Sequence, residues 1–224
     1  MSRKISTLIE LLQRRASETP DRTAYIFLED GETETSRLTY AELHQRASAI
    51  GSWLQSHEAA GERALLLYPS GLDYIAGLFG CLYSGAIAVP AYPPRHNRTL
   101  DRFEGIINDA QPAFALTTKD IGLKAEMFGA ESLKLVETDR IENSFADCWQ
   151  EPSINEDSLA FLQYTSGSTA APKGVMTIKR RPALYPLGLC PEGKQGRRSR
   201  RLMIVREGFG ASVAHHLASA TSPL

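Results

Sequence analysis

Residues 162–176 read LQYTSGSTAAPKGVM. A short apolar start leads into four Ser and Thr side chains around Gly167, and the stretch closes on Lys173 between a proline and a glycine. Backbone N–H groups, hydroxyl groups and an ammonium group all donate hydrogen bonds, and in a tight turn they can converge on one anion. The stretch therefore predicts a loop that binds an anion such as a phosphate.

This loop differs from the common P-loop, which requires Gly, four further residues and then Gly-Lys-Ser/Thr. Here Pro172 precedes Lys173, and Gly174 follows it. A simpler alternative is a Ser-, Thr- and Gly-rich surface turn between two strands, which composition alone favours equally.

With Pro172, Lys173 and Gly174 in register, the stretch resembles the nucleotide-binding signature of adenylate-forming acyl ligases. This superfamily comprises acyl-CoA synthetases, peptide-synthetase adenylation domains and fatty acyl-AMP ligases. The match fails only at Ala170, where the family usually has a glycine that permits a backbone conformation or approach hindered by a Cβ. The resemblance runs from about Ser6 to Met176 and includes LTYAEL at residues 38–43. Three further segments look most like the fatty acyl-AMP ligase branch: LYPSGLDY (67–74), GCLYSGAIAVP (80–90) and AYPPR (91–95).

The resemblance implies a two-step reaction. A fatty carboxylate attacks the α-phosphate of ATP, pyrophosphate leaves, and the acyl-adenylate passes to a thiol of an acyl carrier protein or coenzyme A. Mg²⁺ and cationic or N–H donors must neutralise the triphosphate. The resemblance assigns no catalytic or metal-ligating residue in this chain, and it assigns the phosphate contacts to Thr165, Ser166, Gly167, Ser168, Thr169, Lys173 and Gly174.

The order of apolar segments predicts an α/β fold. Thr7 with Glu10, and Thr39 with Glu42, form capping-box patterns that predict helix starts. We expect helices at 7–20, 39–54, 72–85, 99–109 and 120–128. A first strand at 23–28 and a second that follows the turn at 29–31 and ends at about 38 are expected to form a hairpin. Further strands are expected at 63–68, 86–89, 113–117, 133–137 and 159–164. This alternation predicts a mostly parallel sheet flanked by helices, as in the N-terminal subdomain of the adenylate-forming fold, with the loop at a strand's carboxyl end.

Individual polar and aromatic residues outside the loop receive structural interpretations. Tyr68, Tyr74 and Tyr83 are interpreted as core or cleft-wall aromatics. The glycines of 71–85 are interpreted as sites of close packing. His44, His57 and His96 lie singly in polar contexts and are predicted to be solvated.

Composition excludes several classes of protein. The 224 residues are 42% hydrophobic and 23% charged, which is ordinary for a globular domain. Cys81, Cys148 and Cys190 show neither a disulfide pattern nor zinc-ligand spacing, so we expect a cytoplasmic protein. No apolar run approaches the roughly 20 residues of a membrane-spanning helix.

Charge divides the chain at Met176. Up to that residue there are 16 Lys and Arg against 24 Asp and Glu, whereas from Thr177 onward there are 9 against 2. We therefore expect residues 6–176 to be the N-terminal part of an AMP-binding domain and 177–224 to be a basic tail, out of frame and disordered. A genuine fusion and a partner-binding tail are the alternatives. The run RRSRR at 197–201 lacks the neighbouring aromatics of a nucleic-acid site, so we expect no nucleic-acid partner.

The chain lacks the later motifs that the resemblance predicts. These are a Tyr-Gly-x-Thr-Glu run, a ribose-binding Asp, a hinge and a C-terminal domain with an adenylation lysine. We therefore expect an inactive fragment of a fatty acid ligase. The alternative is a non-catalytic nucleotide-binding or interaction module with a basic tail.

Overall fold

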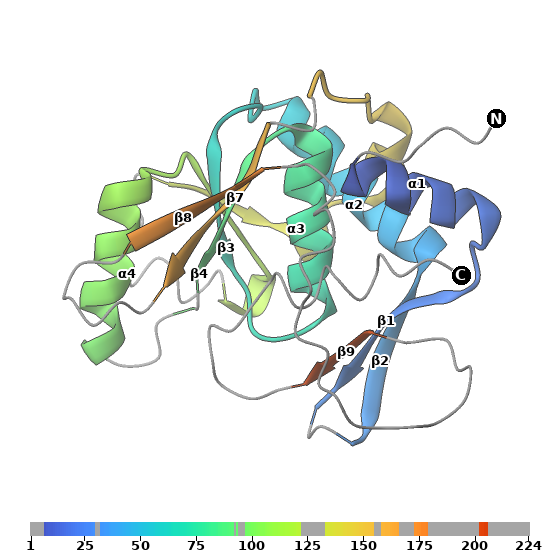
Figure 1. Cartoon of the computed structure of the whole chain (residues 1–224), viewed down its shortest axis with the longest axis horizontal. Helices are drawn as coiled ribbons and strands as arrows, with labels where there is room; N and C mark the ends of the chain where they lie inside the picture. The colour runs from blue at the N-terminus through green and yellow to red at the C-terminus, as the bar shows by residue number, and fades with distance from the viewer. Residues whose placement is uncertain are drawn as a thin grey trace.

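The computed structural model describes residues 7–29, 32–91, 93, 97–121, 133–154, 158–165, 173–178 and 202–205. Figure 1 shows a central sheet with α4 (Asn97–Ala110) on one side and α2 (Tyr40–Gln55) and α3 (Leu72–Ser84) on the other. This is the helix-flanked α/β architecture that the sequence predicts.

Helix starts follow the predicted capping boxes. At α1 (Leu8–Glu18) the Glu10 N–H donates to the Thr7 hydroxyl at 3.1 Å, and Glu10 accepts from the Thr7 N–H at 3.4 Å. The same reciprocal pair joins Thr39 and Glu42 at α2. Both boxes satisfy N–H groups that a helix start otherwise leaves without partners, so these two boundaries are set locally.

The main sheet has six strands in the order β6-β5-β3-β4-β7-β8. The first five are parallel, and β8 pairs antiparallel with β7 at the edge. The predicted parallel sheet is confirmed, with one antiparallel edge strand that was not predicted. The strands are β3 (Arg63–Leu67), β4 (Ile87–Ala91), β5 (Phe114–Thr117), β6 (Lys134–Glu137), β7 (Leu159–Thr165) and β8 (Lys173–Ile178).

A second sheet has the order β2-β1-β9. The hairpin of β1 (Thr23–Leu28) and β2 (Glu34–Thr39) agrees with the prediction, and β9 (Leu202–Val205) pairs with β1 in parallel. β8 ends at Ile178, just beyond the predicted boundary at Met176. Most of the tail lies outside the described residues, so its out-of-frame origin and its disorder stay predictions.

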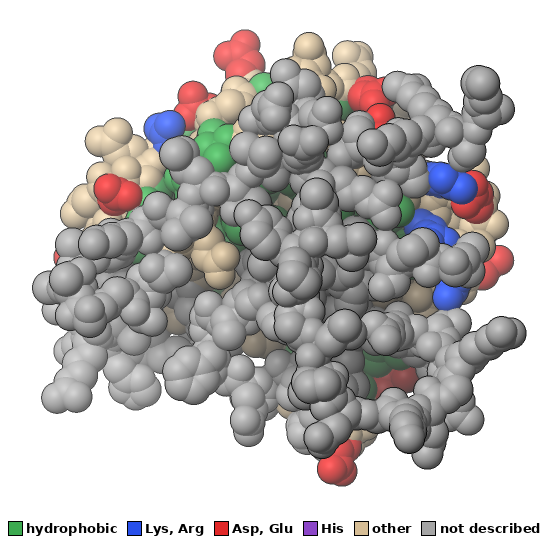
Figure 2. Space-filling view, viewed as in Figure 1, with side chains coloured by type: hydrophobic (Ala, Val, Ile, Leu, Met, Phe, Trp, Pro, Cys, Tyr) green, Lys and Arg blue, Asp and Glu red, His purple; other side chains and the backbone are tan. Residues whose placement is uncertain are grey.

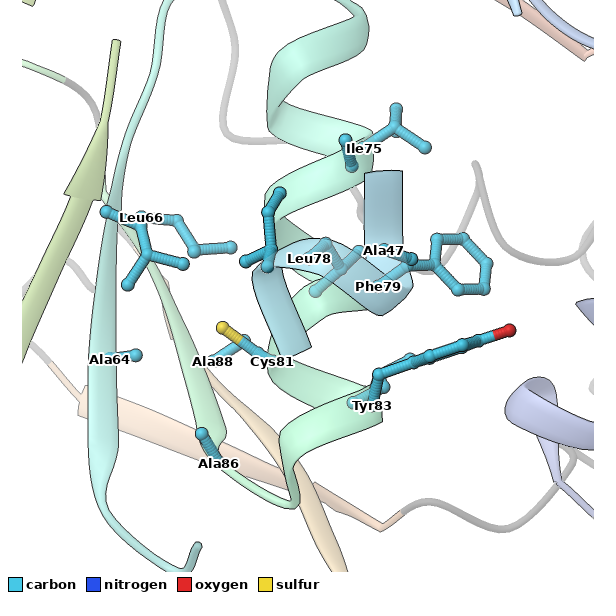
Figure 3. Packing of buried hydrophobic residues seen from close by; sticks show 14 of the residues in the cluster. Ala47, Ala64, Leu66, Ile75, Leu78, Phe79, Cys81, Tyr83, Ala86 and Ala88 are labelled. Carbon is cyan, nitrogen blue, oxygen red and sulfur yellow. The ribbon is translucent and has the colours of Figure 1, made fainter. Parts of the chain in front are cut away.

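The larger hydrophobic core lies between the sheet and helices α1 to α3. In Figure 3, Leu78 on α3 lies beside Leu66 of β3, and Ala47 of α2 lies near Phe79 on another side of α3. A Cβ on Gly80 would lie 2.3 Å from Cγ2 of Ile50, so the close approach of α2 and α3 requires glycine there. This confirms the packing interpretation for Gly80.

The smaller core lies on the α4 face of the sheet. Its buried members are Leu65, Leu67, Val89, Phe103, Ile106, Ala110, Ala115 and Tyr164. Strand residues that point alternately to the two faces supply both cores, since successive side chains on a strand face opposite sides. In β3, for example, Leu66 contributes to the larger core and Leu67 to the smaller one.

The three tyrosines lie in the interior as predicted, but two histidine predictions are wrong. Nδ1 of His44 lies 2.9 Å from the Tyr83 hydroxyl, and His44 is half-buried. His57 is also half-buried and stacks on Trp53, with the ring centroids 3.8 Å apart. The partner of His44 comes from the packing of α2 against α3, whereas the partner of His57 lies four residues earlier in the chain. His96 and most of the predicted helix 120–128 lie outside the described residues.

Charged side chains that the structure describes lie around the periphery of the view in Figure 2, with basic and acidic groups side by side near α1. One such pair is Arg14 with Glu18, at 2.7 Å and exposed. Among the described residues, no helix is both long and apolar enough to cross a bilayer.

Candidate functional site

The candidate site lies where the direction of the sheet's connections reverses. From the central β3 the chain passes to β4 on one side and then to β5 on the other. Such a reversal leaves a crevice beyond the carboxyl ends of the strands, where ligands of open α/β sheets bind. β7 lies beside β4 and parallel to it, so its carboxyl end at Thr165 lies at the same edge.

The predicted phosphate loop connects β7 to β8. Thr165 and Lys173 are Cα partners in the antiparallel ladder, and Tyr164 is paired with Gly174. The two ends of the loop are therefore held side by side: of the residues predicted to bind phosphate, Thr165 and Lys173 form the closing pair, and Gly174 follows it on β8. Ser166, Gly167, Ser168 and Thr169 lie outside the described residues.

Tyr164 attaches this hairpin to the helix on its face of the sheet. The side chain is 8% exposed and belongs to the smaller core. Its hydroxyl donates to Oδ2 of Asp109 on α4 at 2.5 Å. Burial, followed by the hydrogen bond to the Asp109 carboxylate, raises the pKa of Tyr164 to about 12. Sequence reasoning missed this contact, because the partners are 55 residues apart.

A buried hydroxyl network joins the carboxyl ends of three adjacent strands. The Tyr68 and Thr138 hydroxyls lie 2.8 Å apart, and Thr138 also donates to the Thr117 carbonyl at 3.1 Å. The Thr117 hydroxyl donates to the Leu67 carbonyl at 2.8 Å. Burial raises the pKa of Tyr68 well above its usual value. The network keeps these polar groups hydrogen-bonded and fixes the edge of β3, β5 and β6.

A surface pocket of about 520 Å³ opens between α2, the start of α3 and the segment after β6. Arg46 and the half-buried Asp73, which both line it, form an ion pair at 3.4 Å. The pKa of the Asp73 carboxyl is raised, chiefly by burial; Arg46 opposes this shift and Asp139 adds to it. The pocket carries charges of both signs, which favours no single class of ion. Sequence analysis did not predict it, because its residues come from three separate segments.

The residue types in the hairpin loop match the hydrogen-bonding needs of a nucleoside triphosphate. Hydroxyl and backbone N–H donors next to a lysine match phosphate oxygens, which are strong acceptors of charge-assisted hydrogen bonds. The pairing of Thr165 with Lys173 keeps the first predicted donor next to the lysine at one end of the hairpin. Phosphate binding by this loop stays a prediction.

Comparison with known proteins gives the family. A family model described as AMP-binding enzyme matches residues 12–203. The medium-chain-fatty-acid–[acyl-carrier-protein] ligase JamA of Moorena producens is 49% identical over 182 residues, which are 77% of this chain and 31% of JamA. The long-chain-fatty-acid–AMP ligase FadD32 of Mycobacterium marinum is 35% identical over 76% of this chain and 28% of its own length.

A solved structure supports the same assignment. The fatty acyl-adenylate ligase of Legionella pneumophila, in complex with acyl adenylate and pyrophosphate, is 38% identical with a TM-score of 0.70. The alignment covers 77% of this chain and 30% of that one. This chain therefore spans less than a third of the length of each of these three relatives, which are named as ligases of fatty acids or as a fatty acyl-adenylate ligase. The match over most of its length shows that the chain belongs to the AMP-binding enzyme family, and its resemblance to the fatty acyl-AMP ligases is confirmed.

Proposed function

We propose that this chain supplies the ATP-phosphate-binding part of a fatty acyl-AMP ligase, which activates a fatty carboxylate as an acyl-adenylate. The observation that carries this proposal is the β7–β8 hairpin, whose closing pair Thr165 and Lys173 brackets the Ser-, Thr- and Gly-rich loop. The names of the relatives supply the substrate class, since they act on medium-chain and long-chain fatty acids.

Each member of the loop has a role in this proposal. The hydroxyls of Thr165, Ser166, Ser168 and Thr169 and the backbone N–H groups of Gly167 and Gly174 donate to the β- and γ-phosphates. The Lys173 ammonium neutralises part of their charge. ATP supplies the adenylyl group and Mg²⁺ further neutralises the triphosphate. Residues 6–176 form the N-terminal part of the adenylation domain, and all of the proposed phosphate contacts lie before residue 177.

The name of one relative supports a proposal for the acceptor of the acyl group. JamA is named as a ligase for the acyl carrier protein. We infer that the thiol acceptor in the intact ligase is an acyl carrier protein or coenzyme A. Incubating the intact ligase with ATP, a fatty acid and each acceptor distinguishes them by the thioester that forms.

Binding of ATP to the full 224-residue chain tests the loop directly. We expect Lys173→Ala to weaken ATP binding about tenfold or more, since a charge-assisted hydrogen bond contributes roughly 1.5–3 kcal/mol. Lys134→Ala is the matched control. Lys134 lies on the opposite edge strand β6, with its ammonium 5.3 Å from the Trp53 ring centre, so its loss leaves ATP affinity unchanged. Equal effects of the two substitutions in equilibrium dialysis would reject the proposed phosphate loop.

Exchange of radiolabelled pyrophosphate into ATP separates binding from chemistry. We expect this chain by itself to show background exchange with medium-chain and long-chain fatty acids, because later adenylation motifs are lacking in its sequence. ATP binding without exchange fits a phosphate-binding part of a ligase, and exchange above background would show that the chain holds a complete adenylation site.

A further inference from the structure

We propose that Asp109 and Tyr164 are positioning residues for the loop between β7 and β8. The proposal rests on the proposed phosphate-binding role of that loop, because it explains how the hairpin that carries the loop is held. The Tyr164 hydroxyl donates to the Asp109 carboxylate at 2.5 Å and thereby joins β7 to the last turn of α4. Neither side chain is assigned a contact with ATP.

The position of Tyr164 places this hydrogen bond next to the closing pair of the hairpin. Tyr164 immediately precedes Thr165, which pairs with Lys173 to close the hairpin. Phe161 of β7 is aligned with Ala88 of β4, which attaches β7 to the parallel sheet at a position before the closing pair. The contact with α4 is a second point of attachment, located one residue from the closing pair.

The cross-strand partner of Tyr164 favours the same geometry. Directly opposed residues in an antiparallel ladder carry their side chains on the same face. The partner is Gly174, which has no side chain, so no neighbour on β8 competes with the tyrosine ring at this pair. The ring is buried in the smaller core with Phe103 and Ile106 of α4. The glycine of the loop signature therefore leaves the tyrosine space to reach the helix.

The location of Asp109 is unfavourable for the helix itself. A carboxylate in the last turn of a helix lies at the negative end of the helix dipole, which costs stability. Hydrogen bonds to charged groups are stronger than those between neutral groups, and the bond from Tyr164 offsets this cost. Asp109 thus stabilises the attachment of the hairpin rather than the end of α4.

Amide hydrogen exchange of the full chain tests the attachment without any ligand. We expect Tyr164→Phe to speed the exchange of amides in residues 159–178 about tenfold, because the hairpin opens more often once the hydroxyl is lost. Tyr83→Phe is the matched control: it removes the hydroxyl that lies 2.9 Å from His44 in the larger core and should leave this exchange unchanged. Unchanged exchange in Tyr164→Phe would overturn the proposal.

Substitutions at Asp109 show whether the two residues act together. Asp109→Ala should speed hairpin exchange as much as Tyr164→Phe does, and combining the two should add little further. Asp109→Asn keeps an acceptor oxygen and should restore most of the protection. Full additivity of the two effects would contradict a shared hydrogen bond.

ATP affinity then separates this inference from the proposed function. If the wild-type chain binds ATP, Tyr164→Phe should raise the dissociation constant about threefold to tenfold while the melting temperature changes no more than in Tyr83→Phe. If the wild-type chain does not bind ATP, the proposed function fails, and hydrogen exchange still decides whether Asp109 and Tyr164 hold the hairpin.

Discussion

Among the described residues, 30 buried side chains form the core on the α2/α3 face of the sheet, whereas eight form the core on the α4 face. The larger core includes the helix contact at Gly80 and Ile50 and the hydroxyl network around Tyr68. The smaller core includes Tyr164, next to the closing pair of the phosphate loop. The larger core thus holds most of the buried side chains, whereas the smaller core lies next to the hairpin of the candidate site.

Two substitutions that each remove three carbon atoms test this comparison most strongly. Leu78 is 1% exposed in the larger core, and Ile106 is 5% exposed in the smaller core. We expect Leu78→Ala to lower the free energy of unfolding by about 3–5 kcal/mol and Ile106→Ala by about 2 kcal/mol, because the smaller core can collapse around its cavity more easily. Urea unfolding followed by circular dichroism measures both. Equal losses would show that the two faces contribute alike.

The contact between α2 and α3 gives the next largest effect. Adding a Cβ at Gly80 places it 2.3 Å from Cγ2 of Ile50, which forces the helices apart. We expect Gly80→Ala to lower the unfolding free energy by about 1–3 kcal/mol, as overpacked cores do. Combining it with Ile50→Ala, which removes the clashing Cγ2, should cost less than the sum of the two single changes. Strict additivity would place the strain elsewhere.

Two neighbouring tyrosines on this face make a paired test of the buried hydroxyl groups. Tyr68 is hydrogen-bonded to Thr138, whereas the buried Tyr74 hydroxyl has no hydrogen-bond partner among the described residues. Tyr68→Phe should lower the unfolding free energy by about 1 kcal/mol, since it removes a satisfied bond. Tyr74→Phe should be neutral or stabilising, because it removes an unsatisfied polar atom from the interior. Thermal unfolding measures the stability of both variants. A Tyr74→Phe variant less stable than Tyr68→Phe would refute this explanation.

The parts of the fold that sequence predicts well are those set by neighbouring residues. The capping boxes at Thr7 and Thr39 place two helix starts, because a side chain and a backbone N–H three residues apart decide them. Gly85 ends α3 with φ of 83°, a left-handed conformation that glycine adopts without strain. Local chemistry is sufficient at such positions.

Contacts between distant segments could not be predicted in the same way. The β8 strand begins inside the loop signature at Lys173, so a sequence interpretation focused on phosphate binding assigned those residues to a loop. The simpler alternative of a turn between two strands describes the backbone on either side of the loop correctly. A turn between two strands and a phosphate-binding loop do not exclude each other, because the loop connects the two strands of a hairpin. The partners of Tyr164 and His44 depend on packing across 55 and 39 residues, which a single sequence does not specify.

The smallest expected effect is a pH dependence on the larger-core face. Burial lowers the pKa of His44 below its ordinary value of about 6.5. The unfolded chain then binds a proton more readily than the folded chain, so stability is fully present above the unfolded pKa and falls as pH drops from about 6.5 toward the lower folded value. Replacing His44 by Gln should flatten this decline between pH 7 and pH 5, measured as the unfolding free energy in urea at each pH. A decline of the same slope in wild type and His44→Gln would show that other groups cause it, and the half-buried histidine would then contribute no pH sensitivity to this face.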